Sequence, residues 1–169
     1  TFVNVFDKIR LLYAGTSDAK YLGFNNSHFS FNSDKGACPA CNGYGYKKIE
    51  LQFLPDTYVP CELCQGKRYK PEILWITWRG KTISQVLDMY IDEALDFFSE
   101  MDHIKQELEL MVEIGLGYLK MGQPAHTLSG GESQRLKLVK HLLKEYRWNT
   151  VYFLDEPTVG LHPADIEKL

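Results

Sequence analysis

Four cysteines are the residues of this chain best suited to chemistry, because they stand in two close pairs. Cys38 and Cys41 form the first pair, and Cys61 and Cys64 form the second, in the pattern C-x2-C-x19-C-x2-C. Each pair can present two thiolates to one metal ion, and four thiolates complete the tetrahedral shell of a structural Zn²⁺. The spacing therefore predicts that these four cysteines bind zinc.

Glycines follow each cysteine pair, at Gly43, Gly45 and Gly66. They suit tight turns in which backbone amides point at sulfur. Two disulfides or four free buried thiols are the alternative reading of the cysteines. The N-terminal residues do not show the basic and then apolar pattern of a secretion signal. We therefore expect a cytoplasmic chain with reduced cysteines, which favours the metal site.

The charge distribution separates the cysteine region from the rest of an acidic chain. Residues 35–81 carry eight basic and four acidic residues, whereas residues 82–169 carry eight basic and fifteen acidic ones. Aromatic residues alternate with these cations, and cations beside stacking rings suit a nucleic-acid backbone. We predict DNA phosphate contacts at Lys47, Lys48, Lys67 and Arg68. Lysines that are merely solvated on a small metal module are the alternative.

The elements around the cysteines follow from hydrophobic spacing and turn residues. Ile9, Leu12 and Tyr13 have helical spacing and predict a short helix within residues 1–15. A hairpin or an extended arm is expected over residues 47–58, because β-rich stretches flank Pro55 and Asp56. Residues 74–78 predict a short strand. No run of about 18 apolar residues occurs, so no membrane span is expected.

Two helices are expected after the cysteine region. Thr82 and Gln85 match a capping box and start the first helix. Its apolar side carries Ile83, Val86, Leu87, Tyr90, Ile91 and Leu95. The second helix is expected from about Ile104 to Ile114, and the glycines Gly115 and Gly117 end it.

A second motif, Leu128-Ser129-Gly130-Gly131-Glu132, opens a further helix. Ser129 and Glu132 form a capping box, and Leu136, Leu138, Val139, Leu142 and Leu143 are the apolar positions of the helix. Two glycines at a helix N-terminus leave backbone N–H groups open, and the helix dipole adds positive charge there. The motif predicts a phosphate site, with a plain helix cap as the alternative.

A third motif places two acids after an apolar run. Residues 151–154 predict a buried parallel strand, and Asp155 and Glu156 follow it. Acids at such a place suit nucleotide hydrolysis, with Asp155 holding Mg²⁺ and Glu156 orienting and deprotonating the attacking water. A strand that simply ends in a polar turn is the alternative.

These motifs together resemble the UvrA family, the damage-recognition ATPases of bacterial nucleotide excision repair. Leu128 to Glu132 looks like the ABC ATPase signature, and residues 151–156 look like a Walker B strand. Further stretches resemble the C-terminal half of that family in order; they include residues 29–32, 53–56, 59–62, 66–69, 86–89, 115–118 and 155–158. The resemblance implies an α/β fold, of which this chain would be an α+β fragment. The fragment would contain the helical subdomain that carries the ABC ATPase signature, with a four-Cys zinc module inserted into it. It would also contain the Walker B edge of the nucleotide-binding core. We expect boundaries that separate residues 1–35, 36–72 (zinc module), 73–128 (helical subdomain) and 129–169 (signature helix and Walker B segment).

The resemblance also implies roles and partners. The four cysteines would be zinc ligands, and Ser129, Gly130, Gly131, Glu132 and Gln134 would be signature residues that contact ATP bound by another half of the protein. Asp155 and Glu156 would be Walker B residues acting with ATP and Mg²⁺, and Glu156 would be catalytic. The implied partners are damaged duplex DNA, a UvrB-like protein and a second copy of the parent protein.

The sequence departs from the family pattern in two respects. Residues 31–41 look more like the metal module of the family's N-terminal half, which suggests a UvrA paralogue used in resistance to DNA-damaging compounds. No G-x-x-x-x-G-K-[ST] motif occurs, and the chain does not begin with methionine. We therefore expect a fragment of a longer ATPase that does not hydrolyse ATP alone. The alternative is a free-standing zinc-dependent module that binds DNA or protein without ATP chemistry.

Overall fold

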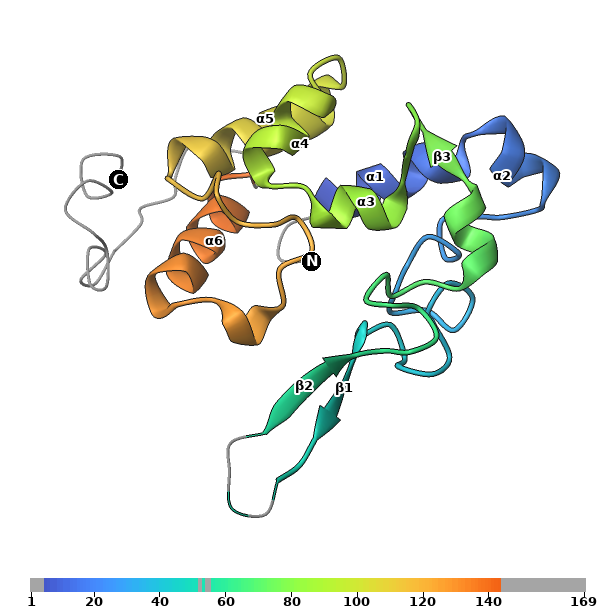
Figure 1. The fold of residues 1–169 in the computed structure, drawn as a ribbon. Helices are drawn as coiled ribbons and strands as arrows, with labels where there is room; N and C mark the ends of the chain where they lie inside the picture. Colours follow the sequence, from blue (N-terminus) through green and yellow to red (C-terminus); the bar gives the residue numbers. More distant parts are fainter. Residues whose placement is uncertain (1–4, 52, 54–55, 144–169) are drawn as a thin grey trace. The chain divides into compact units, whose positions relative to one another are not determined.

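The computed structural model describes residues 5–51, 53 and 56–143, and it contains helices and short strands (Figure 1). The chain forms two compact units, which we call the cysteine unit (residues 7–86) and the helical unit (residues 1–6 and 87–169). The motif with Asp155 and Glu156 lies outside the described residues. The expected boundaries at residues 36, 73 and 129 stay predictions.

The helices of the cysteine unit cover an aromatic core. The helix α1 (Val5–Ala14) confirms the helix expected in residues 1–15, and α2 (Ser17–Tyr21) follows it. Ile9 and Tyr13 are fully buried, as their spacing predicted. The Tyr13 ring lies 5.6 Å from the Phe29 ring, and its hydroxyl donates to the Lys81 carbonyl oxygen at 2.7 Å. Burial raises the pKa of Tyr13 well above its ordinary value.

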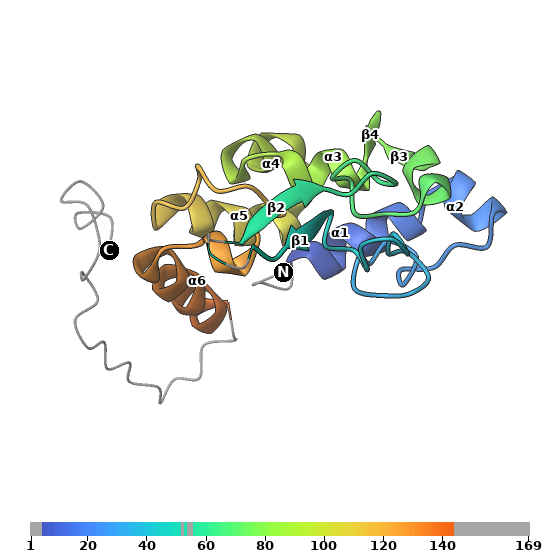
Figure 2. The same ribbon diagram turned by 60° about the horizontal axis from the view of Figure 1, so that its bottom comes forward.

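The predicted hairpin is present between the two cysteine pairs. Strand β1 (Tyr46–Ile49) pairs antiparallel with β2 (Thr57–Pro60), so that Lys47 faces Val59 and Lys48 faces Tyr58. Figures 1 and 2 show the two strands side by side, extending from the loops that carry the cysteines. Side chains along a strand alternate between its faces, so Lys47 and Lys48 point to opposite sides of the hairpin.

The strand expected over residues 74–78 is wrong for its first half. A 3-10 helix, η1 (Pro71–Trp75), occupies that part, because a proline at the first helical position is already set for the helical φ angle. Strand β3 (Thr77–Trp78) then pairs with β4 (Lys81–Thr82). Arg79 and Gly80 connect them with φ angles of 48° and 77°, as a two-residue hairpin turn requires.

The helix expected from residue 83 to residue 95 is divided into two. The Thr82–Gln85 capping box is confirmed: Thr82 N–H donates to Gln85 Oε1 at 2.8 Å, and Gln85 N–H donates to Thr82 Oγ1 at 3.3 Å. Helix α3 (Ile83–Asp88) ends before Tyr90, and α4 (Ile91–Phe97) begins after it.

Strand-like pairing replaces the helix at the break. Tyr90 forms a β-bridge with Lys120, and the Met89 carbonyl accepts a hydrogen bond from Met121 N–H at 2.9 Å. The Tyr90 side chain is 45% exposed, so it does not belong to the buried face on which its spacing placed it.

The helical unit has its core between three helices. Helix α5 (Asp102–Glu113) packs against both α4 and α6 (Gly130–Leu142), and the short η2 (Ala125–Thr127) precedes α6. Gly115 follows α5 with a φ of 76° and ends it, as predicted. The buried residues of this core include Ala94, Phe98, Ile104, Leu108, Met111, Leu116, Leu136 and Val139. None of the described helices combines the length and apolarity needed to span a membrane.

Candidate functional site

The four cysteines form one buried cluster in the cysteine unit. Cys38 Sγ lies 3.9 Å from Cys61 Sγ, and Cys41 Sγ lies 3.6 Å from Cys64 Sγ. All four sulfur atoms lie within 4.8 Å of one another. Four sulfurs at zinc–thiolate distance from one centre would be about 3.8 Å apart, so the cluster fits Zn²⁺. The disulfide alternative is wrong, because a disulfide needs sulfurs about 2.05 Å apart and all four thiols are free.

Two similar turns place the second cysteine of each pair. After Cys41 and Cys64, the next two residues have positive φ angles: 49° and 78° at Asn42 and Gly43, and 50° and 85° at Gln65 and Gly66. The Gly45 N–H donates to Cys41 Sγ at 3.2 Å, which confirms the expected amide contact with sulfur.

Gly43 is required by its surroundings as well as by its backbone angle. A Cβ atom at this position would lie 1.8 Å from the Phe31 carbonyl oxygen, far inside contact distance. Gly66 has a similar φ, but a Cβ there would meet nothing within 4 Å. The two turns therefore have similar backbone angles, but another backbone segment occupies the space that a Cβ atom at Gly43 would need, whereas the corresponding space at Gly66 is open.

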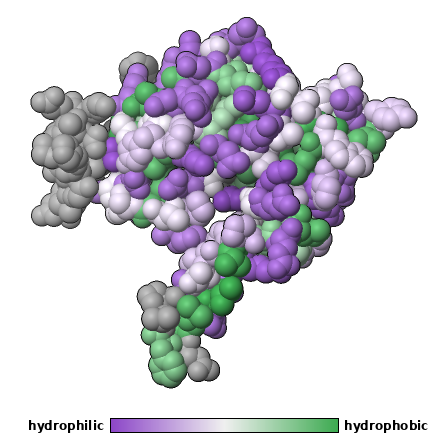
Figure 3. All heavy atoms as spheres, viewed as in Figure 1, coloured by the Kyte–Doolittle hydropathy of each residue, from purple (hydrophilic) through white to green (hydrophobic). Residues whose placement is uncertain are grey.

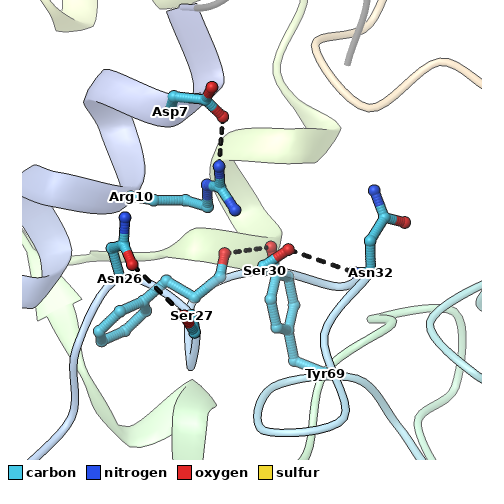
Figure 4. A network of polar contacts seen from close by, with 8 residues as sticks. Asp7, Arg10, Asn26, Ser27, Ser30, Asn32 and Tyr69 are labelled. Atoms are coloured by element: carbon cyan, nitrogen blue, oxygen red, sulfur yellow. Dashed lines mark hydrogen bonds and ion pairs between the residues drawn. The ribbon is translucent and has the colours of Figure 1, made fainter.

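Backbone hydrogen bonds join the two cysteine segments. Cys38 N–H donates to the Arg68 carbonyl at 2.8 Å, and Cys61 N–H donates to the Gly45 carbonyl at 2.9 Å. Tyr69 is buried beside this junction, and its hydroxyl donates to the Phe29 carbonyl at 3.0 Å (Figure 4). The cysteine loops are thus held by bonds that do not involve sulfur.

The same close-up shows polar contacts that fix the neighbouring segments. Arg10 and Asp7 form an ion pair within α1, and the Asn32 N–H donates to Ser30 Oγ at 3.3 Å (Figure 4). The bond between Asn32 and Ser30 lies in the loop that carries Phe29 and Phe31.

The thiols have unequal proton affinities. Burial raises the pKa of Cys41, and it raises the pKa of Cys64 to about 12. Hydrogen bonding by the Cys64 backbone N–H lowers the pKa of Cys61 to about 7. Four neighbouring thiolates therefore need a cation to be ionised together, and a divalent metal ion is such a cation.

The side chains predicted to contact DNA differ in their contacts within the protein. The Lys48 ammonium lies 2.8 Å from the Asp56 carboxylate and 3.2 Å from that of Glu50, and the bond to Asp56 is the main cause of its raised pKa. Lys47 and Lys67 are exposed. The Arg68 guanidinium lies over the Phe31 ring, 5.2 Å from its centroid.

The hairpin also has two chemically different faces. Tyr46 and Tyr58 meet edge to face at 5.1 Å, and Tyr44 lies 6.0 Å from Tyr46. Strand alternation places Lys48 on that tyrosine face and Lys47 with Ile49 and Val59 on the other. Figure 3 shows hydrophobic residues along the hairpin surface.

A second candidate site lies in the helical unit at the start of α6. We call residues 128–132 the signature loop. Ser129 Oγ accepts from the Glu132 N–H at 3.2 Å, and Glu132 Oε2 accepts from the Ser129 N–H at 2.7 Å, so the capping box is confirmed. The Ser129 hydroxyl hydrogen is left to donate elsewhere.

Gly130 leaves room for a ligand at the start of α6, whereas Gly131 is buried. The N–H groups of Gly130 and Gly131 have no acceptor within the helix, because they belong to its first turn. A Cβ at Gly130 would meet nothing within 4 Å, so packing does not require glycine there. Gln134 is exposed on the next turn of α6. This arrangement can accept an anion that approaches the backbone closely.

Two residues that sequence reasoning missed hold the signature loop. Arg135 is only 4% exposed, and its guanidinium donates to the carbonyls of Ile114 and Gly115 at 3.1 and 3.2 Å. The Tyr118 hydroxyl donates to Glu132 Oε1 at 2.6 Å. The acceptors of Arg135 lie 21 and 20 residues away in the sequence, and Glu132 lies 14 residues from Tyr118. Short-range sequence patterns therefore do not predict these hydrogen bonds.

Ionisation within this network follows its hydrogen bonds. Burial acts to raise the pKa of Glu132, but bonds from the Tyr118 hydroxyl and the Ser129 N–H outweigh it and lower that pKa. Burial, and then the bond to Glu132, raise the pKa of Tyr118. The Tyr118 hydroxyl therefore keeps its proton and Glu132 stays a carboxylate near neutral pH.

Comparison with known proteins gives matches over the whole chain. UvrABC system protein A of Halalkalibacterium halodurans is 54% identical over 169 residues, which are 100% of this chain and 18% of that protein. The protein of the same name from Mycobacterium tuberculosis is also 54% identical over 169 residues, 17% of its length. The chain thus spans less than a fifth of these relatives. No protein-family model matches the chain.

A solved structure has the same fold. The crystal structure of UvrA2 from Deinococcus radiodurans matches with a TM-score of 0.91 and 50% identity, over 98% of this chain and 20% of that one. Because identities to UvrABC system protein A and to UvrA2 differ by only a few percent, the paralogue prediction stays open.

Proposed function

We propose that this chain, which belongs to the UvrA family, is one segment of a longer DNA-damage-recognition ATPase. In this proposal the cysteine unit binds zinc and contacts DNA, and the signature loop contacts ATP held by another half of the parent protein. The observation that carries the proposal is the identity of 54% over all 169 residues of the chain.

The zinc part of the proposal rests on the geometry of the thiols. Cys38, Cys41, Cys61 and Cys64 would hold the ion in a shell with no open position, which makes the site structural. Zinc would supply folding energy and would fix the base of the β1–β2 hairpin. The ion would have no part in the ATPase reaction.

The nucleotide part rests on the signature loop. The Ser129 hydroxyl and the N–H groups of Gly130 and Gly131 are suited to phosphate oxygens, and the helix dipole of α6 adds to the attraction. Glu132 would act by holding the cap, since both its carboxylate oxygens already accept hydrogen bonds. By family resemblance, Asp155 would bind Mg²⁺ and Glu156 would activate water, and Gln134 would lie at the rim of the nucleotide site.

The DNA part rests on the cations of the cysteine unit. Lys47 and Lys67 are exposed and would bind phosphates, with Arg68 beside them, whereas Lys48 already has two carboxylate partners. The partners of the parent protein would be damaged duplex DNA, a UvrB-like protein and a second copy of itself.

The test uses the full-length parent protein. Lys47, Lys48, Lys67 and Arg68 are replaced together by alanine, and DNA affinity is measured at several salt concentrations after zinc content is checked. The control replaces Lys20 and Lys105, which lie outside the cysteine loops and the hairpin. We expect weaker binding and a salt slope reduced by about one unit per lost phosphate contact. Wild-type affinity and slope in the fourfold variant would contradict the DNA part.

A further inference from the structure

The segment that follows α5 holds Tyr118 firmly in place by its backbone. The carbonyls on both sides of Tyr118 accept hydrogen bonds from the first N–H groups of α4: Ile91 N–H donates to Leu119 O at 2.9 Å, and Asp92 N–H donates to Gly117 O at 3.2 Å. A Cβ at Gly117 would lie 1.8 Å from Asp92 Oδ1, so the two segments are in close contact. The base from which the Tyr118 side chain extends is thus fixed.

From this base the Tyr118 hydroxyl reaches the carboxylate that caps α6. It donates to Glu132 Oε1 at 2.6 Å, while Glu132 Oε2 accepts from the Ser129 N–H. Hydrogen bonds with an ionised partner are shorter and stronger than neutral ones. One carboxylate therefore connects the Tyr118 segment to the serine of the signature loop.

The other contacts of the signature loop lie on either side of this connection. Leu128 and Leu136 line an apolar pocket together with Met111 and Leu119. Arg135 donates to the carbonyls at the end of α5. These contacts hold the helix and the start of the loop, but among the described side chains it is Glu132 that bonds to the backbone of Ser129.

We propose that Tyr118 is a positioning residue for the signature loop: its hydroxyl orients the Glu132 carboxylate, which in turn fixes Ser129 and the open N–H groups of Gly130 and Gly131. The expected effect of Tyr118 on ATP turnover rests on the proposed function. Its structural content, that Tyr118 orders residues 128–132, stands independently of any nucleotide.

The test replaces Tyr118 by phenylalanine in the full-length protein, which removes the hydroxyl and keeps the ring. We expect amide hydrogen exchange in residues 128–133 to become about tenfold faster, as for the loss of a hydrogen bond to a charged group, with exchange in α5 unchanged. We expect kcat for ATP to fall about tenfold, with less than a twofold change in ATP affinity under non-hydrolysing conditions. Tyr90→Phe is the matched control in the same unit, and it should change neither quantity.

A double-mutant cycle separates positioning from general packing. In a Glu132→Ala background the hydroxyl has lost its acceptor, so Tyr118→Phe should add no further change in exchange or turnover. Additive effects would overturn the inference, and so would unchanged exchange in the single variant, whatever turnover does. Faster exchange with unchanged turnover would uphold the positioning role and contradict the ATP role of the signature loop instead.

Discussion

The ammonium group of Lys48 lies 2.8 Å from the carboxylate of Asp56, across the β1–β2 hairpin. Its sequence neighbour Lys47 faces Val59 and points to the other side of the hairpin. Two adjacent lysines with the same formal charge therefore differ in how readily their ammonium groups can bind DNA phosphates.

This difference predicts unequal effects of two single substitutions. In the full-length protein, Lys47→Ala should lower the salt dependence of DNA binding by about one unit, as for one lost phosphate contact. Lys48→Ala should change it much less, because Asp56 and Glu50 already neutralise that ammonium. Equal slopes for the two variants would show that the Lys48 ion pairs do not persist when DNA is bound.

The two glycine turns of the cysteine unit give a second matched pair. Gly43→Ala should make zinc far easier to remove by a chelator, because the added methyl group overlaps the Phe31 carbonyl. Gly66→Ala imposes only the backbone strain of its positive φ, of the order of 1 kcal/mol, because the space around it is open. The rates of zinc release to a coloured chelator compare them, and similar rates would contradict this account of Gly43.

The lowered pKa of Glu132 predicts a pH-dependent cap. A carboxyl whose folded pKa lies below its unfolded value adds stability above the unfolded pKa, and this stability is lost as pH falls through the folded pKa. Glu132→Gln should therefore speed amide exchange of residues 129–133 at neutral pH, after correction for intrinsic rates. The difference from wild type should shrink toward pH 3. A difference that stays constant with pH would mean that ionisation of Glu132 does not support the cap.

The local features of both candidate sites could be predicted from the sequence. The cysteine cluster, the hairpin and the capping boxes at Thr82 and Ser129 depend on spacings of a few residues, or on a metal-site pattern with its own signature. The strand expected at residues 74–75 was wrong, because Pro71 starts a 3-10 helix there.

The remaining features depend on contacts between distant segments. The helix expected over residues 83–95 divides at Tyr90 because Lys120 pairs with it, and nothing near Tyr90 in the sequence indicates that bridge. The bond between Tyr118 and Glu132 likewise requires the fold of α5 and α6 to be known. Lys48 pairs with Asp56 only because of the register of the hairpin.

ATP turnover should require the parent protein. The sequence contains no G-x-x-x-x-G-K-[ST] motif to hold the β- and γ-phosphates, so this chain alone should hydrolyse ATP negligibly. In the full-length protein, Glu156→Gln should abolish turnover and keep nucleotide binding, since water activation alone is lost. Phosphate release assays on both proteins provide the test. Robust ATPase activity of the isolated chain would contradict the prediction that hydrolysis requires the rest of the parent protein.

The zinc content of the purified protein tests the central claim most directly. Elemental analysis of protein prepared without chelators should give one zinc per chain, bound by Cys38, Cys41, Cys61 and Cys64. Cys61→Ser should lose the ion and disorder residues 36–72, while the helices after Thr82 stay folded, because structural zinc supplies folding energy of order 10 kcal/mol in small modules. Wild-type protein without zinc, folded over residues 36–72, would contradict the account.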